Sequence, residues 1–372
     1  MKKTVLFSLL ALTATLCADG EVIADANMMK DQPKKQPQTQ MNNQSLMNVV
    51  TLTSARPESK NGWYLFADAL YWKADIGSTD WANVNDTSDP TKTEAHNHSL
   101  NFKWDWGFRA GIGANIDHDM WDSNFYYTWF FTDQSNSAGK PNSIVVDQIG
   151  IDAVNLGRPL TTGSIKWNVH FSMFDWELGR WHYVSKNLAL RPHVGVKGGW
   201  INQSIHSEFG NPVAPSISLK EKFENNYWGV GPSVGINTTW VLGTSGKEMD
   251  NRFSLFGDFG GALMYGHFEI DNKQETRTTT GLQIQGLNQK GLDRNLATAM
   301  LQGILGFSWD TAFNRDRCHF MFKVGYELQY WFRQNQLIRS FVSPTGSLAA
   351  RNQRLSDDLS LQGITAEVRF DF

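Results

Sequence analysis

Charged and histidine side chains recur at every second position in several stretches of this chain. Lys103, Asp105 and Arg109 alternate with apolar residues, and Arg191, His193 and Lys197 do the same further along. Side chains two residues apart point to the same face of a β-strand. Opposite charges on one such face can line a water-filled path that sorts solutes by charge and size. The candidate pore-lining residues are Lys103, Asp105, Arg109, Lys166, His170, Arg191, His193, Lys197, Lys323, Glu327, Glu367 and Arg369, together with Asp175, Glu177 and Asp258.

Long β-strands are the elements that must position these side chains. In residues 100–116 every even position is apolar, whereas the odd positions carry polar residues or glycine, and residues 319–332 repeat the pattern. Similar segments bring the expected number of strands to ten. Several exceed the roughly 9–11 residues that a tilted strand needs to cross a bilayer. In residues 164–184 the pattern changes phase after Met173, which predicts a β-bulge.

The connections between these strands alternate in length. Long connections of about 25–30 residues alternate five times with much shorter ones. A transmembrane β-barrel has this asymmetry, with brief periplasmic turns and extended extracellular loops. The sequence therefore predicts an all-β fold, a transmembrane antiparallel up-and-down β-barrel of about 10 strands. An extra hairpin in SIVVDQIGI or in TRTTTGLQIQ would raise the number to 12.

The N-terminal part of the chain has a different character. Residues 1–18 combine two lysines, an apolar run and a small-residue ending, which is the layout of a secretory signal peptide. Residues 19–60 are rich in Gln, Asn, Pro and Lys, so we expect a disordered periplasmic segment. Residues 61–372 would then form one transmembrane barrel. We expect export to the outer membrane of a Gram-negative-type bacterium, in contact with its lipid.

The last strand ends on its own apolar face, with Val368, Phe370 and Phe372 at alternate positions. This ending resembles the C-terminal recognition strand that outer-membrane barrels share. The resemblance implies that the barrel-assembly machinery is a partner and that these three residues carry its signal.

Other short motifs resemble the Legionella-type major outer membrane protein family, which also occurs in chlamydia-like bacteria. They are Trp63, the run Ala69–Trp72, the aromatic strand Trp104–Arg109 leading into Gly111 and Gly113, and the terminal Phe372. The likeness covers about residues 60–372. It implies a pore-forming outer-membrane protein whose surface loops also meet host cells.

Two functions remain open from the sequence. The first is a porin-like barrel that allows passive diffusion of small hydrophilic solutes through a charged lumen. The alternative is a closed structural or adhesive barrel that acts through its extracellular loops. About eight strands give a packed interior and 16–18 an open channel, so ten lies nearer the packed end. Inward glycines such as Gly111, Gly113 and Gly229 would widen the lumen or permit strand curvature.

Other classes of function receive little support. Outer-membrane proteases with ten strands use Asp and His at the outer rim, and His96, His98, His206, His267, Glu269 and Asp271 lie near expected outer strand ends. No spacing among them matches a metal site or a nucleophile with its base. We therefore expect no enzymatic activity, no cofactor and no metal. The net charge of -3 argues against a nucleic-acid partner.

Overall fold

A computed structural model describes residues 62–88, 94–116, 119–139, 143–149, 160–211, 217–245, 251–278, 283–313, 318–342 and 350–372. The expected signal peptide and the polar segment 19–60 lie outside the described residues. Within the described ranges, no helix has the length and apolar character needed to cross a membrane.

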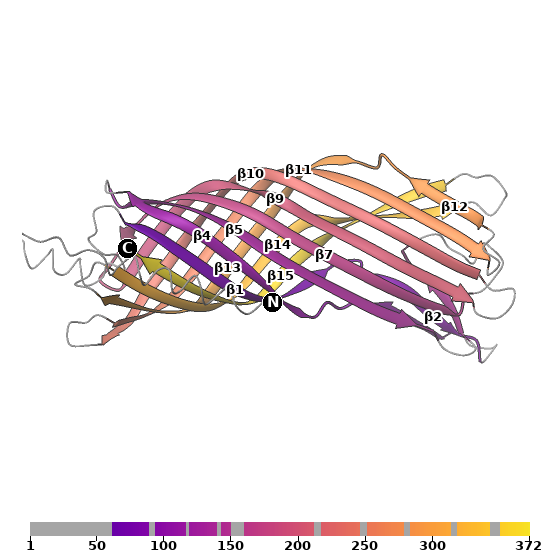
Figure 1. Cartoon of the computed structure of the whole chain (residues 1–372), viewed down its shortest axis with the longest axis horizontal. Coiled ribbons are helices and arrows are strands. Elements are labelled where there is room, and N and C mark those ends of the chain that lie inside the picture. Colours follow the sequence, from indigo (N-terminus) through magenta and orange to yellow (C-terminus); the bar gives the residue numbers. More distant parts are fainter. Residues whose placement is uncertain are drawn as a thin grey trace, which may run out of the picture.

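Ten strands close into a single antiparallel barrel (Figure 1). Each pairs with the wall strands that precede and follow it in the chain, and β1 pairs with β15 to complete the ring, with Tyr64 opposite Asp371. The expected ten-stranded barrel is therefore confirmed. The wall strands are β1 (Trp63–Ile76), β4 (Trp104–Ile116), β5 (Trp121–Ala138), β7 (Thr162–Arg180), β9 (Leu188–Asn211), β10 (Ile217–Ser245), β11 (Asn251–Thr278), β13 (Arg294–Phe313), β14 (Cys318–Val342) and β15 (Ala350–Asp371).

Five shorter strands lie outside this ring. β2 (Asp80–Asp86), β3 (Glu94–Ser99) and β6 (Ser143–Asp147) form a separate three-stranded sheet. β8 (His182–Tyr183) pairs with β9, and β12 (Gln283–Gln289) pairs with β11. The segments SIVVDQIGI and TRTTTGLQIQ thus contribute to β6, β11 and β12 without adding a strand to the wall. The alternative of 12 wall strands is wrong.

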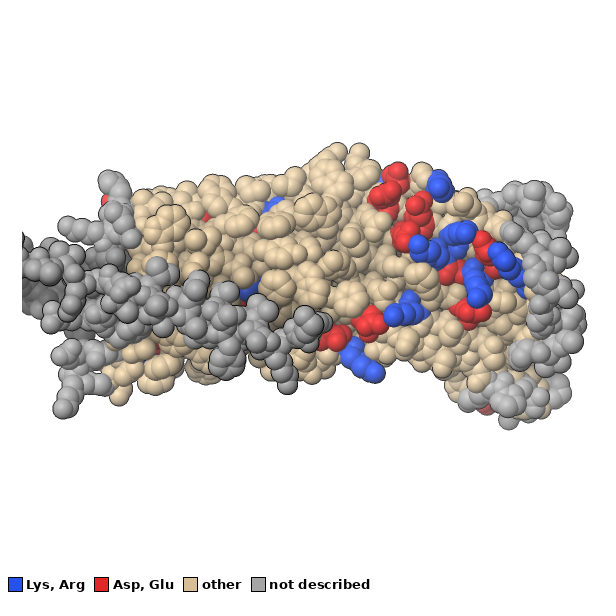
Figure 2. Space-filling model, in the orientation of Figure 1, with Lys and Arg blue, Asp and Glu red and all other residues tan. Residues whose placement is uncertain are grey.

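The wall has two zones along its length. Near the end that holds the short turns and the C-terminus, outward side chains are apolar, as with Phe253, Phe259 and Tyr265 of β11. Further along the same strand the outward residues become charged, with Glu269, Lys273 and Arg277 exposed among them. Figure 2 shows the resulting tan zone and, beyond it, a zone of acidic and basic residues. The apolar zone is suited to contact with lipid. We call it the membrane zone and the charged part the outer extension.

The predicted bulge in residues 164–184 is wrong. β7 pairs with β5 and β9 without a register shift, and its odd positions stay buried from Gly163 to Gly179. Instead, the polar residues and the apolar residues of β7 exchange faces near Met173. Before Met173 the strand belongs to the outer extension, where water is outside and the apolar core is inside. Lys166 and His170 therefore lie on the exposed outer face, and they do not face the lumen.

Candidate functional site: the barrel interior

Arg109 of β4 holds together several strands of the membrane zone from the inside. Its guanidinium forms ion pairs with Asp68 of β1 at 2.9 Å and with Glu327 of β14 at 2.7 Å. Glu327 also accepts hydrogen bonds from Thr365 and Gln329. Arg109 and both carboxylates are nearly inaccessible to solvent, with side-chain exposures of 13%, 1% and 6%. Buried ions require such pairing, because each alone would lose its hydration without compensation.

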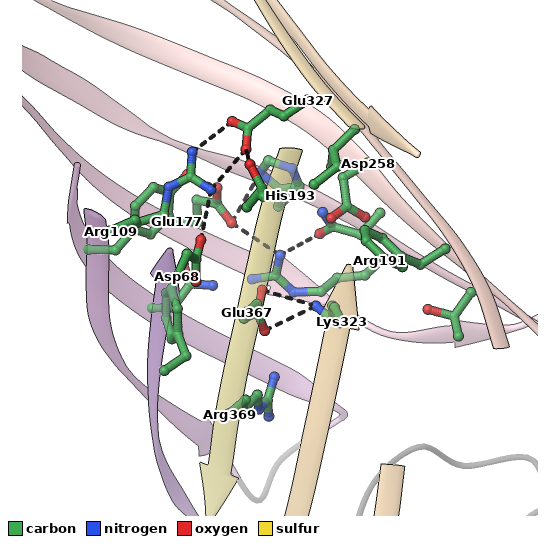
Figure 3. Close-up of a pocket in the computed structure, with 18 of the residues that line it drawn as sticks. Asp68, Arg109, Glu177, Arg191, His193, Asp258, Lys323, Glu327, Glu367 and Arg369 are labelled. Atoms are coloured by element: carbon green, nitrogen blue, oxygen red, sulfur yellow. Dashed lines mark hydrogen bonds and ion pairs between the residues drawn. The ribbon is translucent and has the colours of Figure 1, made fainter. Parts of the chain in front are cut away.

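A second buried group is centred on Arg191 of β9 (Figure 3). Arg191 donates to Asp122 of β5 at 2.8 Å, to Glu177 of β7 at 3.2 Å and to the side-chain oxygen of Asn237 at 2.6 Å. Glu177 additionally accepts a hydrogen bond from the Tyr126 hydroxyl at 2.9 Å. The His193 ring nitrogen lies 3.7 Å from the Glu177 carboxylate. Four neighbouring strands are thereby joined by one arginine.

Three further ion pairs complete the polar interior. Lys323 of β14 lies 3.3 Å from Glu367 of β15, and Lys197 pairs with Asp175. Arg369 pairs with Asp371 at 2.6 Å, and its guanidinium stacks over the Tyr64 ring, 3.6 Å from the ring centroid. The described interior charges are therefore largely paired with one another and present no continuous stripe of one sign.

These groups border one cavity of about 150 Å³. Its lining includes Asp68, Arg109, Glu177, Arg191, His193, Asp258, Lys323, Glu327, Glu367 and Arg369. It is a polar chamber inside the membrane zone.

The inward glycines do not widen the lumen. A Cβ on Gly113 would lie 2.0 Å from the ring of Tyr64, its partner on β1, and one on Gly111 would lie 2.5 Å from the ring of Phe66. A Cβ on Gly266 of β11 would lie 2.1 Å from the ring of Tyr227 on β10, and one on Gly229 would lie 2.2 Å from the Tyr227 hydroxyl within the same strand. Aromatic side chains therefore occupy the space above these glycines. Their role is to admit aromatic side chains beside the strand, as cross-strand glycine–aromatic pairs do.

Above the chamber the interior becomes apolar. Leu70, Trp72, Phe130, Met264 and Met300 are fully or almost fully buried there. The boundary is marked by Trp72, whose indole N–H donates to the Thr365 hydroxyl at 3.1 Å. Trp81 and Trp331 are both 0% exposed and belong to this core.

A hairpin formed by the outer parts of β14 and β15 fills the upper lumen. The pairing of β13 with β14 ends at Met300 opposite Trp331, and that of β1 with β15 ends at Ile76 opposite Leu359. β14 then bends at Arg333, which has a positive φ of 54°, and its register with β15 shifts. Residues 334–338 are 0–6% exposed. We call residues 333–342 and 350–358 the inner hairpin.

Side chains from the opposite wall hold the inner hairpin. The backbone oxygen of Gln334 accepts hydrogen bonds from Asn225 of β10 at 3.2 Å and from Gln203 of β9 at 3.4 Å. The backbone oxygen of Ile338 accepts one from Asn272 of β11 at 3.1 Å. Neither β9 nor β10 is a ladder neighbour of β14, so these bonds cross the lumen. The hairpin is therefore tied across the lumen to the opposite wall.

The structure brings together most of the predicted pore-lining residues and leaves four apart. Arg109, Arg191, His193, Lys197, Lys323, Glu327, Glu367 and Arg369 all lie in the interior of the membrane zone. Lys103 is exposed before β4, and Asp105 accepts a hydrogen bond from Thr132 away from the chamber. Lys166 and His170 lie outside, where Lys166 pairs with Asp133 and His170 accepts from the Trp129 indole.

Several interior groups are absent from the sequence-derived set. Asp122, Tyr126 and Asn237 contribute to the Arg191 group. The sequence did indicate a special role for Asp68, because it is the one polar residue in an otherwise apolar stretch of β1 before Lys73. Among the described residues, no group of three or more His, Cys, Asp or Glu side chains is arranged to hold a metal ion. Val368, Phe370 and Phe372 lie near the C-terminal end of the membrane zone, and their role as an assembly signal stays a prediction.

Comparison with known proteins places the chain among outer-membrane proteins. A family model described as Legionella pneumophila major outer membrane protein precursor matches residues 55–372. No curated protein matches the chain.

Three solved structures that resemble this one are distant in sequence. The outer-membrane protease OmpT from Escherichia coli is 9% identical, with 86% of this chain and 99% of that chain covered, at a TM-score of 0.35. The Pseudomonas putida toluene transporter TodX is 11% identical, with 88% and 93% covered, at 0.27. A Pseudomonas aeruginosa FadL homologue is 8% identical, with 84% and 90% covered, at 0.24. At these TM-scores the likenesses carry no argument about function.

Proposed function

Because the chain belongs to the Legionella pneumophila major outer membrane protein family, we propose that it is an outer-membrane barrel that is closed to solutes and acts through its extracellular part. The inner hairpin is the observation that carries this proposal. Five consecutive residues, 334–338, lie almost inaccessible inside the barrel and are bound to the opposite wall. Their position inside the barrel supports a lumen that does not pass hydrated solutes.

The paired charges below the hairpin support the same function. A charged lumen selects solutes when its groups face mobile water and ions. Here Arg109 and Arg191 form ion pairs with buried carboxylates at 2.7–3.2 Å. Such pairs fasten strands to one another. The barrel then serves as a rigid base that raises the charged outer extension and its loops above the membrane, where host surfaces are the proposed contact.

Conductance in a planar bilayer tests this function. The mature chain, residues 19–372, is refolded, and heat-modifiable gel migration verifies closure of the barrel. We expect no discrete current steps from the folded protein. Reproducible steps whose size changes with Arg191→Glu or Lys197→Glu would overturn the proposal and place both side chains along an ion path.

A second function is a channel whose gate is the inner hairpin. The observation that favours it is that the polar chamber of about 150 Å³ lies on the same axis as a hairpin whose hydrogen bonds to β9, β10 and β11 come from three amide side chains. The triple variant Gln203→Ala, Asn225→Ala, Asn272→Ala tests it in the same bilayer. Current steps in the triple variant alone would identify a gate, whereas silence in both proteins would support the closed barrel.

A further inference from the structure

An apolar groove of about 370 Å³ lies on the outside of the wall, across β7, β9 and β10. Its sides include Phe174, Trp176, Trp200 and Trp228, which are 38–50% exposed and belong to the membrane zone. Gly198 lies between the outward residues Val196 and Trp200, so this part of the groove has no side chain. Because the groove opens toward the membrane, a lipid chain is the ligand that its surroundings supply.

The outward residues above this groove change in a definite order. On β9, Trp200 is followed by Asn202, Ser204 and His206. On β7, read in the same direction, Phe174 is followed by Ser172, His170, Asn168 and Lys166. The strands therefore present aromatic rings first, mainly amide and hydroxyl groups next, and cationic or titratable groups last.

The pairing register of the three strands places their cationic or titratable residues in one row. Lys166 of β7 and Lys222 of β10 both stand directly opposite His206 of β9. An anion that bridges this row could accept charge-assisted hydrogen bonds from both lysines. The lysines also pair with Asp133 and Glu224, but those side chains are 35–55% exposed. Ion pairs that are this exposed to solvent contribute little free energy. A phosphate can therefore replace the carboxylates.

The height of this row decides which lipid fits. His206 lies six residues beyond Trp200, which corresponds to about 20 Å along a strand. With a strand tilt of about 45°, the row stands roughly 14 Å above the aromatic side chains. The headgroup layer of an ordinary bilayer adds only about 5–8 Å on each side. A simple phospholipid therefore does not reach the row, whereas a lipid with an extended, phosphorylated sugar headgroup does.

We propose that β7, β9 and β10 form a binding site for an anionic, acylated glycolipid of the outer leaflet. One acyl chain occupies the groove over Gly198, the sugar contacts Asn202 and Ser204, and a phosphate bridges Lys166, His206 and Lys222. This proposal rests on the outer-membrane location and is independent of whether the lumen conducts.

Binding of lipid A, a phosphorylated and acylated disaccharide, tests the site. The mature chain is placed in phosphatidylcholine nanodiscs, and bound lipid A is measured by native mass spectrometry. Gly198→Leu should fill the groove; a Cβ at this position meets its nearest atoms at 3.4 Å, an ordinary contact. We expect Gly198→Leu and the double variant Lys166→Ala, Lys222→Ala each to weaken binding at least about tenfold.

The matched control removes two other exposed cations of the outer extension, Arg277→Ala with Lys290→Ala, and should leave binding unchanged. Heat-modifiable migration verifies that each variant is folded, and the double lysine variant remains informative if Gly198→Leu does not fold. Equal binding of phosphatidylglycerol and lipid A would overturn the proposal, as would unchanged binding in both variants. A change of oligomeric state in Gly198→Leu would assign the groove to a second copy of the chain.

Discussion

At the scale of residues, the interior charges stabilise the barrel by being paired. Arg109, for example, forms ion pairs with Asp68 and Glu327, whose side chains are 1% and 6% exposed. The net value of such a buried arrangement is small, because desolvation offsets the attraction. Removal of one partner is costly, because the remaining charges stay buried without compensation.

We therefore expect Arg109→Ala to lower the free energy of unfolding by about 3–5 kcal/mol. Lys166→Ala is the matched control, because its ion pair with Asp133 is about half exposed. Pairs of that kind contribute about 0–1 kcal/mol. Urea unfolding, followed by tryptophan fluorescence, measures both values. Equal, small losses in the two variants would mean that water reaches Arg109 and that the interior is open.

Gly113 tests the packing of glycine against aromatic rings. A Cβ here would lie 2.0 Å from the Tyr64 ring, and Arg369 stacked on that ring keeps it from moving aside. We expect Gly113→Ala to lower the free energy of unfolding by about 1–3 kcal/mol through overpacking. Gly198→Ala, whose new methyl would meet only ordinary contacts, should change it much less. The same urea titration compares them, and similar values would contradict the packing assigned to Tyr64.

At the scale of elements, the bend in β14 turns a wall strand into the inner hairpin. Arg333 takes a left-handed conformation, its backbone N–H donates to Asp358 at 2.7 Å, and the ladder with β15 changes register there. The same aspartate accepts a hydrogen bond from the Tyr330 hydroxyl at 2.6 Å. Asp358 therefore fixes the point at which the hairpin leaves the wall.

Glycine should suit the bend better than arginine. The left-handed conformation costs a residue with a Cβ about 1–2 kcal/mol, while glycine loses about 0.5–1 kcal/mol more entropy on folding. Arg333→Gly should then raise the free energy of unfolding by about 0.5–1 kcal/mol. Gln353→Gly, on the same hairpin with no positive φ, should lower it. Destabilisation by Arg333→Gly would show that β14 continues straight in the wall.

Much of this fold follows from the sequence, and the residues placed on the wrong side of the wall share one physical cause. Alternation and connection lengths predict the ten wall strands, the closing pair β1 and β15, and the inward direction of Arg109, Arg191 and Glu327. Alternation separates two faces without saying which face meets water. Lys166 and His170 were placed in the lumen because polar was equated with inward, which holds only where lipid surrounds the wall. The polar stretch Arg333–Gln336 was the sequence signal of the bend, since it interrupts the alternation of residues 319–332.

At the scale of the whole molecule, the barrel combines two environments in one continuous wall. On its outer surface the membrane zone is apolar and the outer extension is charged (Figure 2). The interior of the membrane zone is charged, whereas that of the outer extension combines apolar side chains with buried amides such as Asn225 and Asn272. Long strands such as β10, with 29 residues, pass through both. The core of the outer extension and the inner hairpin occupy the interior, while the charged surface and the proposed glycolipid site face the surroundings.

Thiol labelling of the inner hairpin is the most direct test that the barrel is closed. Leu337→Cys and Gln353→Cys are each made with Cys318→Ser and exposed to a membrane-impermeant maleimide in proteoliposomes. Leu337 is 6% exposed, whereas Gln353 on the same hairpin is exposed. We predict rapid labelling at position 353 and protection at position 337 until the protein is unfolded. Rapid labelling at both positions in the folded barrel would contradict the closed interior.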